Sequence, residues 1–244
     1  MRLPFDIRPL SGARPGFHVP VVLQGYLNEH KHHWALRFPV VMALPPAGVV
    51  LAAGASNRLG QPKALVRVGG ATLVARAVDQ LTALGCSPVY VVTRSALMVD
   101  VLLEAGRATV LVNSDPDAGR TGSLQLALKA LYAERGRWPS HVVMAPVDRP
   151  GWRLDTVEPL LARSGCSAPA FGGRRGHPVT LDAEAMSSVL GASPSASLRD
   201  AVSFEAVAAH GPWLGLNIDT PEALSHLLEN EAALTAYWAE GEGI

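Results

Sequence analysis

Cysteine is scarce in this chain, which has only Cys86 and Cys166 among its 244 residues. The two lie far apart in the sequence and outside any Cys-x-x-Cys or His/Cys spacing. The pattern therefore indicates neither a disulfide framework nor a zinc site. We interpret both as small apolar side chains of a protein from a reducing compartment.

Long hydrophobic runs and a surplus of charge are missing as well. No apolar run approaches the ~18 residues of a membrane-spanning helix, and residues 1–27 lack the ordered regions of a secretory signal. The 21 Lys and Arg residues balance the 21 Asp and Glu residues, so no bulk field favours nucleic acid or an anionic membrane. We expect a cytoplasmic protein with no nucleic-acid or membrane partner, in which any anion site is local.

Residues 1–45 show no regular hydrophobic periodicity, since neither a helical nor an alternating pattern persists there. Prolines interrupt this part at Pro4, Pro9, Pro15, Pro20 and Pro39. We expect an N-terminal extension here. Because Met42 stands just before the first convincing strand, we hypothesise that the natural start is Met42 and that residues 1–41 are upstream translation.

From residue 48 onward, strand and helix patterns alternate. Apolar β-branched runs predict strands over 49–53, 89–93, 109–112 and 141–147, and helical spacing predicts helices over 72–84, 96–105 and 121–135. The order then loosens, with helices expected over 153–163, 182–190 and 197–202, strands over 168–171, 178–181 and 214–218, and a last helix beginning at Thr220 and Pro221. This order predicts one α/β domain over 46–230 with a mostly parallel sheet, followed by a C-terminal tail over 231–244.

The first predicted strand runs into a glycine-rich loop, Leu51-Ala-Ala-Gly-Ala-Ser-Asn-Arg-Leu-Gly-Gln-Pro-Lys63. In an open α/β sheet, ligands bind beyond the carboxyl ends of the strands, where this loop must lie. Gly54 and Gly60 allow positive φ and a close approach of backbone to ligand. Arg58 and Lys63 add a planar fork and a point charge for phosphate. The loop matches neither the Walker A nor the dinucleotide fingerprint, yet it predicts a polyphosphate site.

The loop resembles the signature Leu-Ala-Ala-Gly-x-Ser-x-Arg-x-Gly-x-x-Lys of the MobA-like nucleotidyltransferases, and most closely that of the molybdenum cofactor cytidylyltransferases. Four more segments match in order, at 119–128, 147–150, 173–179 and 217–222. The resemblance implies a Rossmann-like, three-layer nucleotide-diphospho-sugar transferase fold of the GT-A type. It also implies an enzyme that transfers a nucleotide and releases pyrophosphate.

The resemblance further implies that Asp148, which follows an apolar strand, holds Mg²⁺, an ion bound by one or two carboxylates plus substrate phosphates. Asp219 is the expected second ligand, with Asn217 as a substitute; alternatively, Asp148 caps the helix expected near Arg153. The expected catalytic residues are Arg58, Lys63 and Asp148. The expected nucleotide-binding residues are Leu51, Ala52, Ala53, Gly54, Arg58, Lys63, Gly122 and Ser123, the last two with free N–H groups and a hydroxyl at a helix start.

An acceptor site is expected in the loop around 173–178. Arg174, Arg175 and His177 suit an anionic acceptor, although a solvated basic turn is the alternative. Arg149 departs from the family pattern, in which this position is uncharged. A cation beside the metal ligand weakens Mg²⁺ binding unless it points away or contacts a substrate phosphate.

The expected reaction is attack by an acceptor oxygen on the α-phosphorus of the triphosphate, assisted by Mg²⁺. The methyl group of Ala53 makes the pocket floor shallower than glycine would, which favours CTP over GTP. Molybdopterin is the expected small phosphorylated acceptor, and a molybdoenzyme is an expected partner. Three alternatives stay open: a sugar- or polyol-phosphate nucleotidyltransferase, a GTP-using molybdopterin guanylyltransferase, and a non-catalytic nucleotide sensor or molybdoenzyme maturation chaperone.

Overall fold

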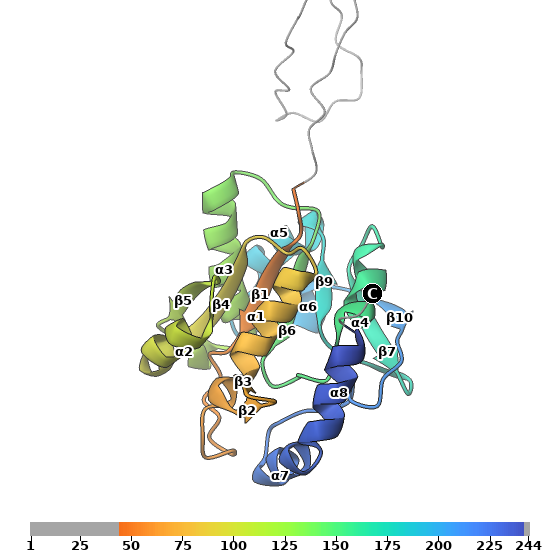
Figure 1. Ribbon diagram of the computed structural model, residues 1–244. Coiled ribbons are helices and arrows are strands. Elements are labelled where there is room, and N and C mark those ends of the chain that lie inside the picture. The colour runs from red at the N-terminus through yellow and green to blue at the C-terminus, as the bar shows by residue number, and fades with distance from the viewer. Residues whose placement is uncertain (1–43, 242–244) are drawn as a thin grey trace, which may run out of the picture. The chain divides into compact units, whose positions relative to one another are not determined.

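The computed structural model describes residues 44–241, in which a mixed β-sheet is covered by helices on both faces (Figure 1). The expected extension lies outside the described residues up to position 43, and so do Met42 and the proposed upstream segment. Of the helices in the described part, none combines the length and hydropathy that a membrane span requires.

The sheet has the strand order β10-β7-β9-β6-β1-β4-β5, and β8 pairs with β7. Its parallel half consists of β1 (Ala47–Leu51), β4 (Val89–Arg94), β5 (Thr109–Asn113) and β6 (Val142–Pro146). The other half contains β7 (Ser167–Phe171), β8 (Arg174–Arg175), β9 (Val179–Leu181) and β10 (Glu205–Ala208), of which β9 runs antiparallel to both its neighbours. A separate hairpin joins β2 (Arg67–Val68) to β3 (Ala71–Thr72).

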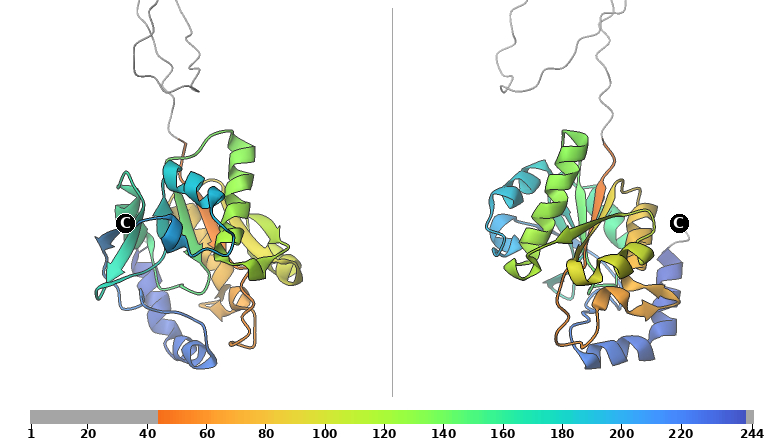
Figure 2. Two further views of the ribbon diagram at one scale, coloured as in Figure 1. Left: turned by 180° about the vertical axis from the view of Figure 1, so that it is seen from behind. Right: turned by 90° about the vertical axis from the view of Figure 1, so that its left-hand side faces the viewer.

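Two hydrophobic cores, one on each face, make this a three-layer α/β fold, as predicted (Figure 2). The first face is covered by α1 (Leu73–Ala83), α2 (Met98–Glu104), α4 (Leu154–Leu161), α7 (Pro221–Glu229) and α8 (Glu231–Gly241). The second face is covered by α3 (Arg120–Arg135), α5 (Ala183–Gly191) and α6 (Leu198–Ala201). Three 3₁₀ turns complete the described chain: η1 (Lys63–Leu65), η2 (Ser95–Leu97) and η3 (Pro116–Ala118).

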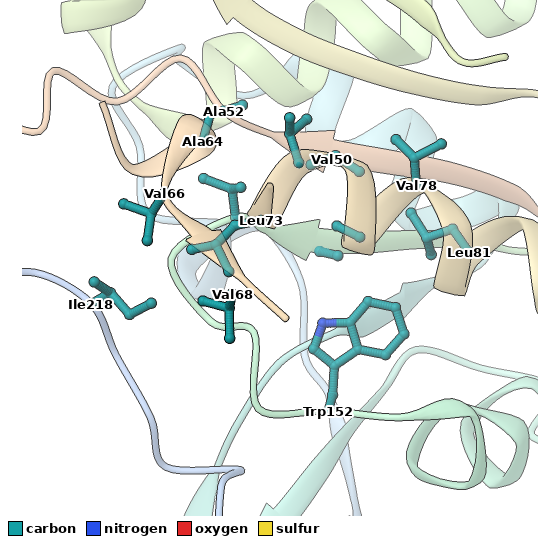
Figure 3. Packing of buried hydrophobic residues seen from close by; sticks show 14 of the residues in the cluster. Val50, Ala52, Ala64, Val66, Val68, Leu73, Val78, Leu81, Trp152 and Ile218 are labelled. Atoms are coloured by element: carbon teal, nitrogen blue, oxygen red, sulfur yellow. The ribbon is translucent and has the colours of Figure 1, made fainter. Parts of the chain in front are cut away.

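Strand β1 shows why the sequence gives a covered sheet. Its side chains alternate between the two cores, with Val50 in the first and Val49 and Leu51 in the second, because successive side chains of a strand point to opposite faces. A strand covered on both faces reads as a continuous apolar run. Figure 3 shows Val50 beside Leu73 and Val78, with Trp152 closing the same core from below.

The structure departs from the expected elements in its C-terminal part. The strand expected over 214–218 was wrong: the segment forms a turn, in which the Leu216 N–H donates to the Trp213 carbonyl at 2.8 Å, and then an irregular stretch. Strand β10 was not expected. The segment from residue 231, expected as a tail, contains α8, whose Trp238 is fully buried and donates from Nε1 to the Pro150 carbonyl at 3.0 Å.

The carboxyl ends of β1 and β6 meet at one edge of the sheet. Leu51 is paired with Pro146, and the Val147 N–H donates to the Leu51 carbonyl at 3.1 Å. The loop after Leu51 and the segment after Pro146 therefore leave the sheet side by side. This edge is the place at which the predicted phosphate loop and Asp148 converge.

Candidate active site

The loop between β1 and η1 is a closed turn that lines a cavity of about 340 Å³. Ser56 and Gly60 have positive φ values of 54° and 75°, and the N–H groups of Leu59 and Gly60 both donate to the Ser56 carbonyl. The Ser56 hydroxyl accepts from the Lys63 N–H at 3.2 Å. Gly54 does not adopt the positive φ that a glycine allows, whereas Ser56 and Gly60 do.

Arg94, at the end of β4, holds the start of this loop. Its Nε donates to the Ala53 carbonyl at 3.0 Å, and its Nη2 lies 3.3 Å from Asp117 Oδ1. Because Ala53 itself is nearly buried, the loop is fixed from the side of the sheet. The N–H groups of Leu59, Gly60 and Lys63 are used within the loop, so those of residues 54–58 are the ones available to a ligand.

Lys63 stands between the two predicted metal ligands. Its Nζ makes a short hydrogen bond to Asp219 Oδ1 and lies 3.5 Å from Asp148 Oδ2. Arg58, which is three-quarters exposed, reaches Asp219 Oδ2 at 3.7 Å. The Lys63 hydrogen bond lowers the pKa of Asp219, with a further contribution from Asn217 Nδ2, which donates to Asp219 Oδ2 at 2.6 Å. Asp219 therefore stays ionised at neutral pH.

Asp219 reaches Asp148 although the two come from segments far apart in the sequence. The Ile218 N–H donates to the Asp148 carbonyl at 3.0 Å. Close by, Gly151 lets the turn at Trp213 approach, because a Cβ at Gly151 would lie 1.8 Å from the Trp213 carbonyl oxygen. The irregular chain around residue 218 thus brings Asp219 to the same cavity as Asp148. Asp148 is not a helix cap, since α4 is capped by Arg153.

The donor set around Asp148 fits a hard divalent cation. Asp148 Oδ1 and Asn217 Oδ1 are buried oxygens without a hydrogen-bond partner among the described residues, and a buried acceptor left unpaired is costly. Within residues 44–241, no cluster of three or more His, Cys, Asp or Glu side chains could hold a metal alone. A cation bound here would complete its shell with water and ligand phosphate, as Mg²⁺ characteristically does.

A second cavity, of about 510 Å³, adjoins the first and shares Leu51, Arg120 and Pro146 with it. Its apolar lining comes from both halves of the sheet and the second core, including Leu124, Met144, Val179 and Phe204. Three arginines also line it: Arg120, Arg175 and Arg199. No Asp or Glu of the described residues does. The cavity therefore suits a ligand with an apolar or flat body and an anionic group.

His177 lies in the wall of this second cavity. Burial, together with the positive charges of Arg149, Arg120 and Arg199, lowers its pKa to about 4. The imidazole is therefore neutral at physiological pH, and its Nδ1 is buried with no hydrogen-bond partner among the described residues. Arg149 contributes to this lowered pKa although it lines neither cavity.

The structure brings most of the predicted site residues together. Leu51, Ala52, Ala53, Gly54, Arg58, Lys63, Ser123, Asp148 and Asp219 all line the first cavity, and Arg175 and His177 line the second. Gly122 lines neither cavity, and the prediction that its N–H is free was wrong, because it donates to the Pro194 carbonyl at 3.1 Å. Arg174 is exposed on β8 and does not line the second cavity.

Arg120 and Arg199 are site residues that the sequence did not indicate. Each lies in the first turn of a helix, α3 or α6. The helices meet because the 194–196 segment packs on the start of α3: Thr121 Oγ1 donates to the Ala196 carbonyl at 2.7 Å, and a Cβ at Gly119 would lie 2.7 Å from the Pro194 oxygen. The one signal for this packing was the pair of glycines at 119 and 122.

Comparison with known proteins gives a consistent picture of the family. A model described as the MobA-like NTP transferase domain matches residues 48–209. Nicotine blue oxidoreductase of Paenarthrobacter nicotinovorans is 38% identical over 150 residues, which cover 56% of this chain and 70% of that protein. The probable molybdenum cofactor guanylyltransferase of Opitutus terrae is 38% identical over 104 residues, which cover 43% of this chain and 48% of that protein.

The fold is shared more widely than the sequence. The crystal structure of an Rv0371c homologue from Mycobacterium sp. strain JC1 superposes with a TM-score of 0.65, covering 77% of this chain and 97% of that one. The two sequences are only 21% identical. The likeness therefore concerns the arrangement of the sheet and its helices.

Proposed function

The chain belongs to the MobA-like NTP transferase family, and on that premise we propose that it transfers a nucleoside monophosphate from a nucleoside triphosphate to a small phosphorylated acceptor, with release of pyrophosphate. The membership and the nucleotidyltransferase class agree with the sequence prediction. The observation that supports the proposal most strongly is that Lys63, Asp148 and Asp219 lie together in the cavity lined by the 51–63 loop.

In this proposal, the loop N–H groups and Arg58 bind the triphosphate, and Lys63 turns from the carboxylates to the leaving pyrophosphate. Positioning and charge stabilisation carry most of the catalysis in such a transfer. The acceptor enters from the second cavity, where Arg120, Arg175 and Arg199 orient its anionic end. A phosphate monoester oxygen is already anionic, so no general base is required. The neutral His177 then offers a hydrogen bond to the acceptor and does not act as an acid.

A divalent cation is typical of this family, and we propose Mg²⁺ for this chain, held by Asp148 and Asp219. When bound, it neutralises charge on the phosphate oxygens and favours the departure of pyrophosphate. The unpaired Asp148 Oδ1 supports this assignment.

The identity of the base is proposed from Ala53, which lines the first cavity. Its methyl group favours the smaller pyrimidine, hence CTP, although one methyl group contributes only about 1–3 kcal/mol of discrimination. GTP is the alternative, since the Opitutus terrae relative is named a guanylyltransferase and this chain spans about half its length. Competition between CTP and GTP for one labelled nucleotide tests the choice.

The acceptor is proposed to be molybdopterin, with a molybdoenzyme as the onward partner. The second cavity supports this choice, because apolar side chains such as Leu124 and Phe204 offer contact to a ring, while serine, threonine and histidine side chains offer hydrogen bonds to the polar groups of a pterin. A sugar or polyol phosphate is the alternative acceptor.

Pyrophosphate release tests the reaction. The full chain is incubated with Mg²⁺, CTP or GTP, and molybdopterin or a sugar phosphate. The proposal expects release that requires both acceptor and metal. Nucleotide binding without turnover under every condition would instead support a sensor or a maturation chaperone.

A second candidate function, a nucleotide-dependent oxidoreductase, is favoured by the name of the Paenarthrobacter nicotinovorans relative. Two adjoining cavities with a shared wall offer room for a dinucleotide, from which a hydride would pass to a bound electron-accepting substrate such as a quinonoid compound. Oxidation of NADPH by a quinonoid dye, followed at the nicotinamide absorbance, tests this candidate. A rate equal to that of the mixture without protein would exclude the oxidoreductase function.

A further inference from the structure

The side of the molecule at β5 and α2 has no role in the proposed reaction. Strand β5 is the last strand at its end of the sheet, and among the described strands only β4 pairs with it. The right-hand view of Figure 2 looks onto this side. The outer N–H and C=O groups of β5 are thus available to another strand.

The chemistry of β5 differs from that of the opposite edge. Residues 109–113 read Thr-Val-Leu-Val-Asn, with no charged residue and no proline. At the other edge, β10 begins with Glu205, which forms an ion pair with Arg163 at 3.4 Å. Proteins protect free edges with charges, prolines or bulges. Because β5 has neither a charged residue nor a proline, its sequence favours pairing with a further strand.

Helix α2, which packs beside β5, exposes an apolar stripe to solvent. Met98, Val99, Leu102 and Leu103 are 42%, 59%, 56% and 78% exposed, whereas Val101 of the same helix is fully buried. Positions three and four apart share one face of a helix, so the four side chains form one surface. Such a surface, continuous with a bare strand edge, marks a protein interface.

We propose that the partner is a second copy of this chain, whose β5 pairs antiparallel with the first about a two-fold axis at Leu111. Charge complementarity supports this partner. Arg107 lies two residues before β5 and Asp115 two residues after it. Antiparallel pairing centred on Leu111 brings the turn that contains Arg107 beside the segment of the other copy that contains Asp115. Both side chains are exposed, and neither forms an ion pair with another described residue.

The same axis brings the two α2 helices together. Because it runs perpendicular to the sheet, both helices lie on the same face of the joined sheet, next to each other across the axis. Their apolar stripes then cover one another. The candidate active sites of both copies stay accessible, so dimerisation does not depend on the proposed reaction.

The proposal is tested by measuring the dimerisation of charge-reversal variants of the full chain by sedimentation velocity. Arg107→Asp or Asp115→Arg creates two like-charge pairs per dimer, so each variant should weaken dimerisation by ~10-fold or more. The double variant restores both pairs with reversed polarity and should regain most of the affinity. Leu103→Glu should weaken the dimer as well, and Glu229→Arg, an exposed charge reversal on α7, should not.

Far-ultraviolet circular dichroism of each variant checks that the chain is folded, which is expected because all of the substituted side chains are exposed. A wild-type chain that is monomeric at ~100 μM, well above the Kd of a specific interface, overturns the proposal. So does a dimer whose affinity is unchanged in both single charge variants, or one that the double variant does not restore.

Discussion

Lys63 occupies the position that a divalent cation would need. Its ammonium group contacts Asp219 Oδ1 and lies 3.5 Å from Asp148 Oδ2, on the two carboxylates that we propose as cation ligands. Two cations cannot occupy so small a space without strong repulsion. We therefore expect metal binding to be coupled to a movement of Lys63 toward a triphosphate.

Replacing Lys63 by Ala should tighten Mn²⁺ binding in the absence of nucleotide by ~10-fold, since a competing charge near two carboxylates is removed. The same variant should bind triphosphate more weakly. Electron paramagnetic resonance of free Mn²⁺ measures the first effect without any turnover. Lys129→Ala, an exposed lysine of α3, is the matched control, and an unchanged Mn²⁺ affinity in Lys63→Ala would argue against the competition.

Replacing Asp148 by Asn should remove metal-dependent turnover almost completely. A bound cation contributes several kcal/mol to the transition state, which corresponds to a rate loss of ~100-fold or more. Pyrophosphate release is the measurement, and Asp79→Asn, an exposed residue of α1, is the control. Retained activity would exclude Asp148 from the mechanism.

His177 should make the folded protein sensitive to mild acid. Its pKa is about 4 when folded and about 6.5 in an unfolded chain. Below pH 6.5 the unfolded state therefore binds a proton that the folded state does not. Stability should fall as the pH drops from 6.5 toward 4, by at most about 3 kcal/mol.

Urea unfolding across this pH range checks the prediction for His177. The variant His177→Gln cannot take up the proton, so its stability should depend less on pH. His226→Gln, on the exposed side of α7, should behave like the wild type. Equal slopes in His177→Gln and the wild type would contradict the assignment.

At the scale of elements, the contact between the 148–152 segment and the 213–218 turn assembles the carboxylate pair. Gly151→Ala should destabilise the protein by about 3 kcal/mol or more, because the new methyl group overlaps the Trp213 carbonyl. Gly191→Ala, with no atom within 4 Å of its added Cβ, should change stability by about 0.5 kcal/mol or less. Chemical unfolding compares the two, and equal effects would show that the close approach is relaxed in solution.

The same contact explains which elements the sequence predicts well. The central strands, α1 and α3 have clear hydrophobic patterns, and their predicted bounds lie within a few residues of the observed ones. The 214–218 segment is apolar because Leu214 and Ile218 fill the first core. Burial and strand formation give the same local pattern, so a buried irregular segment was predicted as a strand.

In the candidate site, residues at a strand end or in a segment that matches the family pattern could be predicted, whereas two arginines whose position depends on helix packing could not. The 51–63 loop and Asp148 both leave the same sheet edge. Arg120 and Arg199 reach the second cavity only because the 194–196 segment packs on α3. Gly122 was assigned to the nucleotide, yet its small size serves that packing.

For the molecule as a whole, ligands that bind the folded state should raise its unfolding temperature. With Mg²⁺ present, a triphosphate at ~100 times its Kd should add about 2.7 kcal/mol of stability. Thermal unfolding with each of the four triphosphates should give the largest shift for CTP. Equal shifts for all four triphosphates would argue against a role of Ala53 in base selectivity. No shift with any triphosphate would contradict the triphosphate site.

The wall common to the two cavities, formed by Leu51, Arg120 and Pro146, has a consequence for inhibitor design. A nucleotide joined covalently to a flat anionic group would occupy both cavities as one compound. Binding of its second half would then be intramolecular, at an effective concentration in the millimolar range for a short flexible linker. Such a bisubstrate compound should bind far more tightly than either half, and it should spare enzymes that share only the nucleotide site.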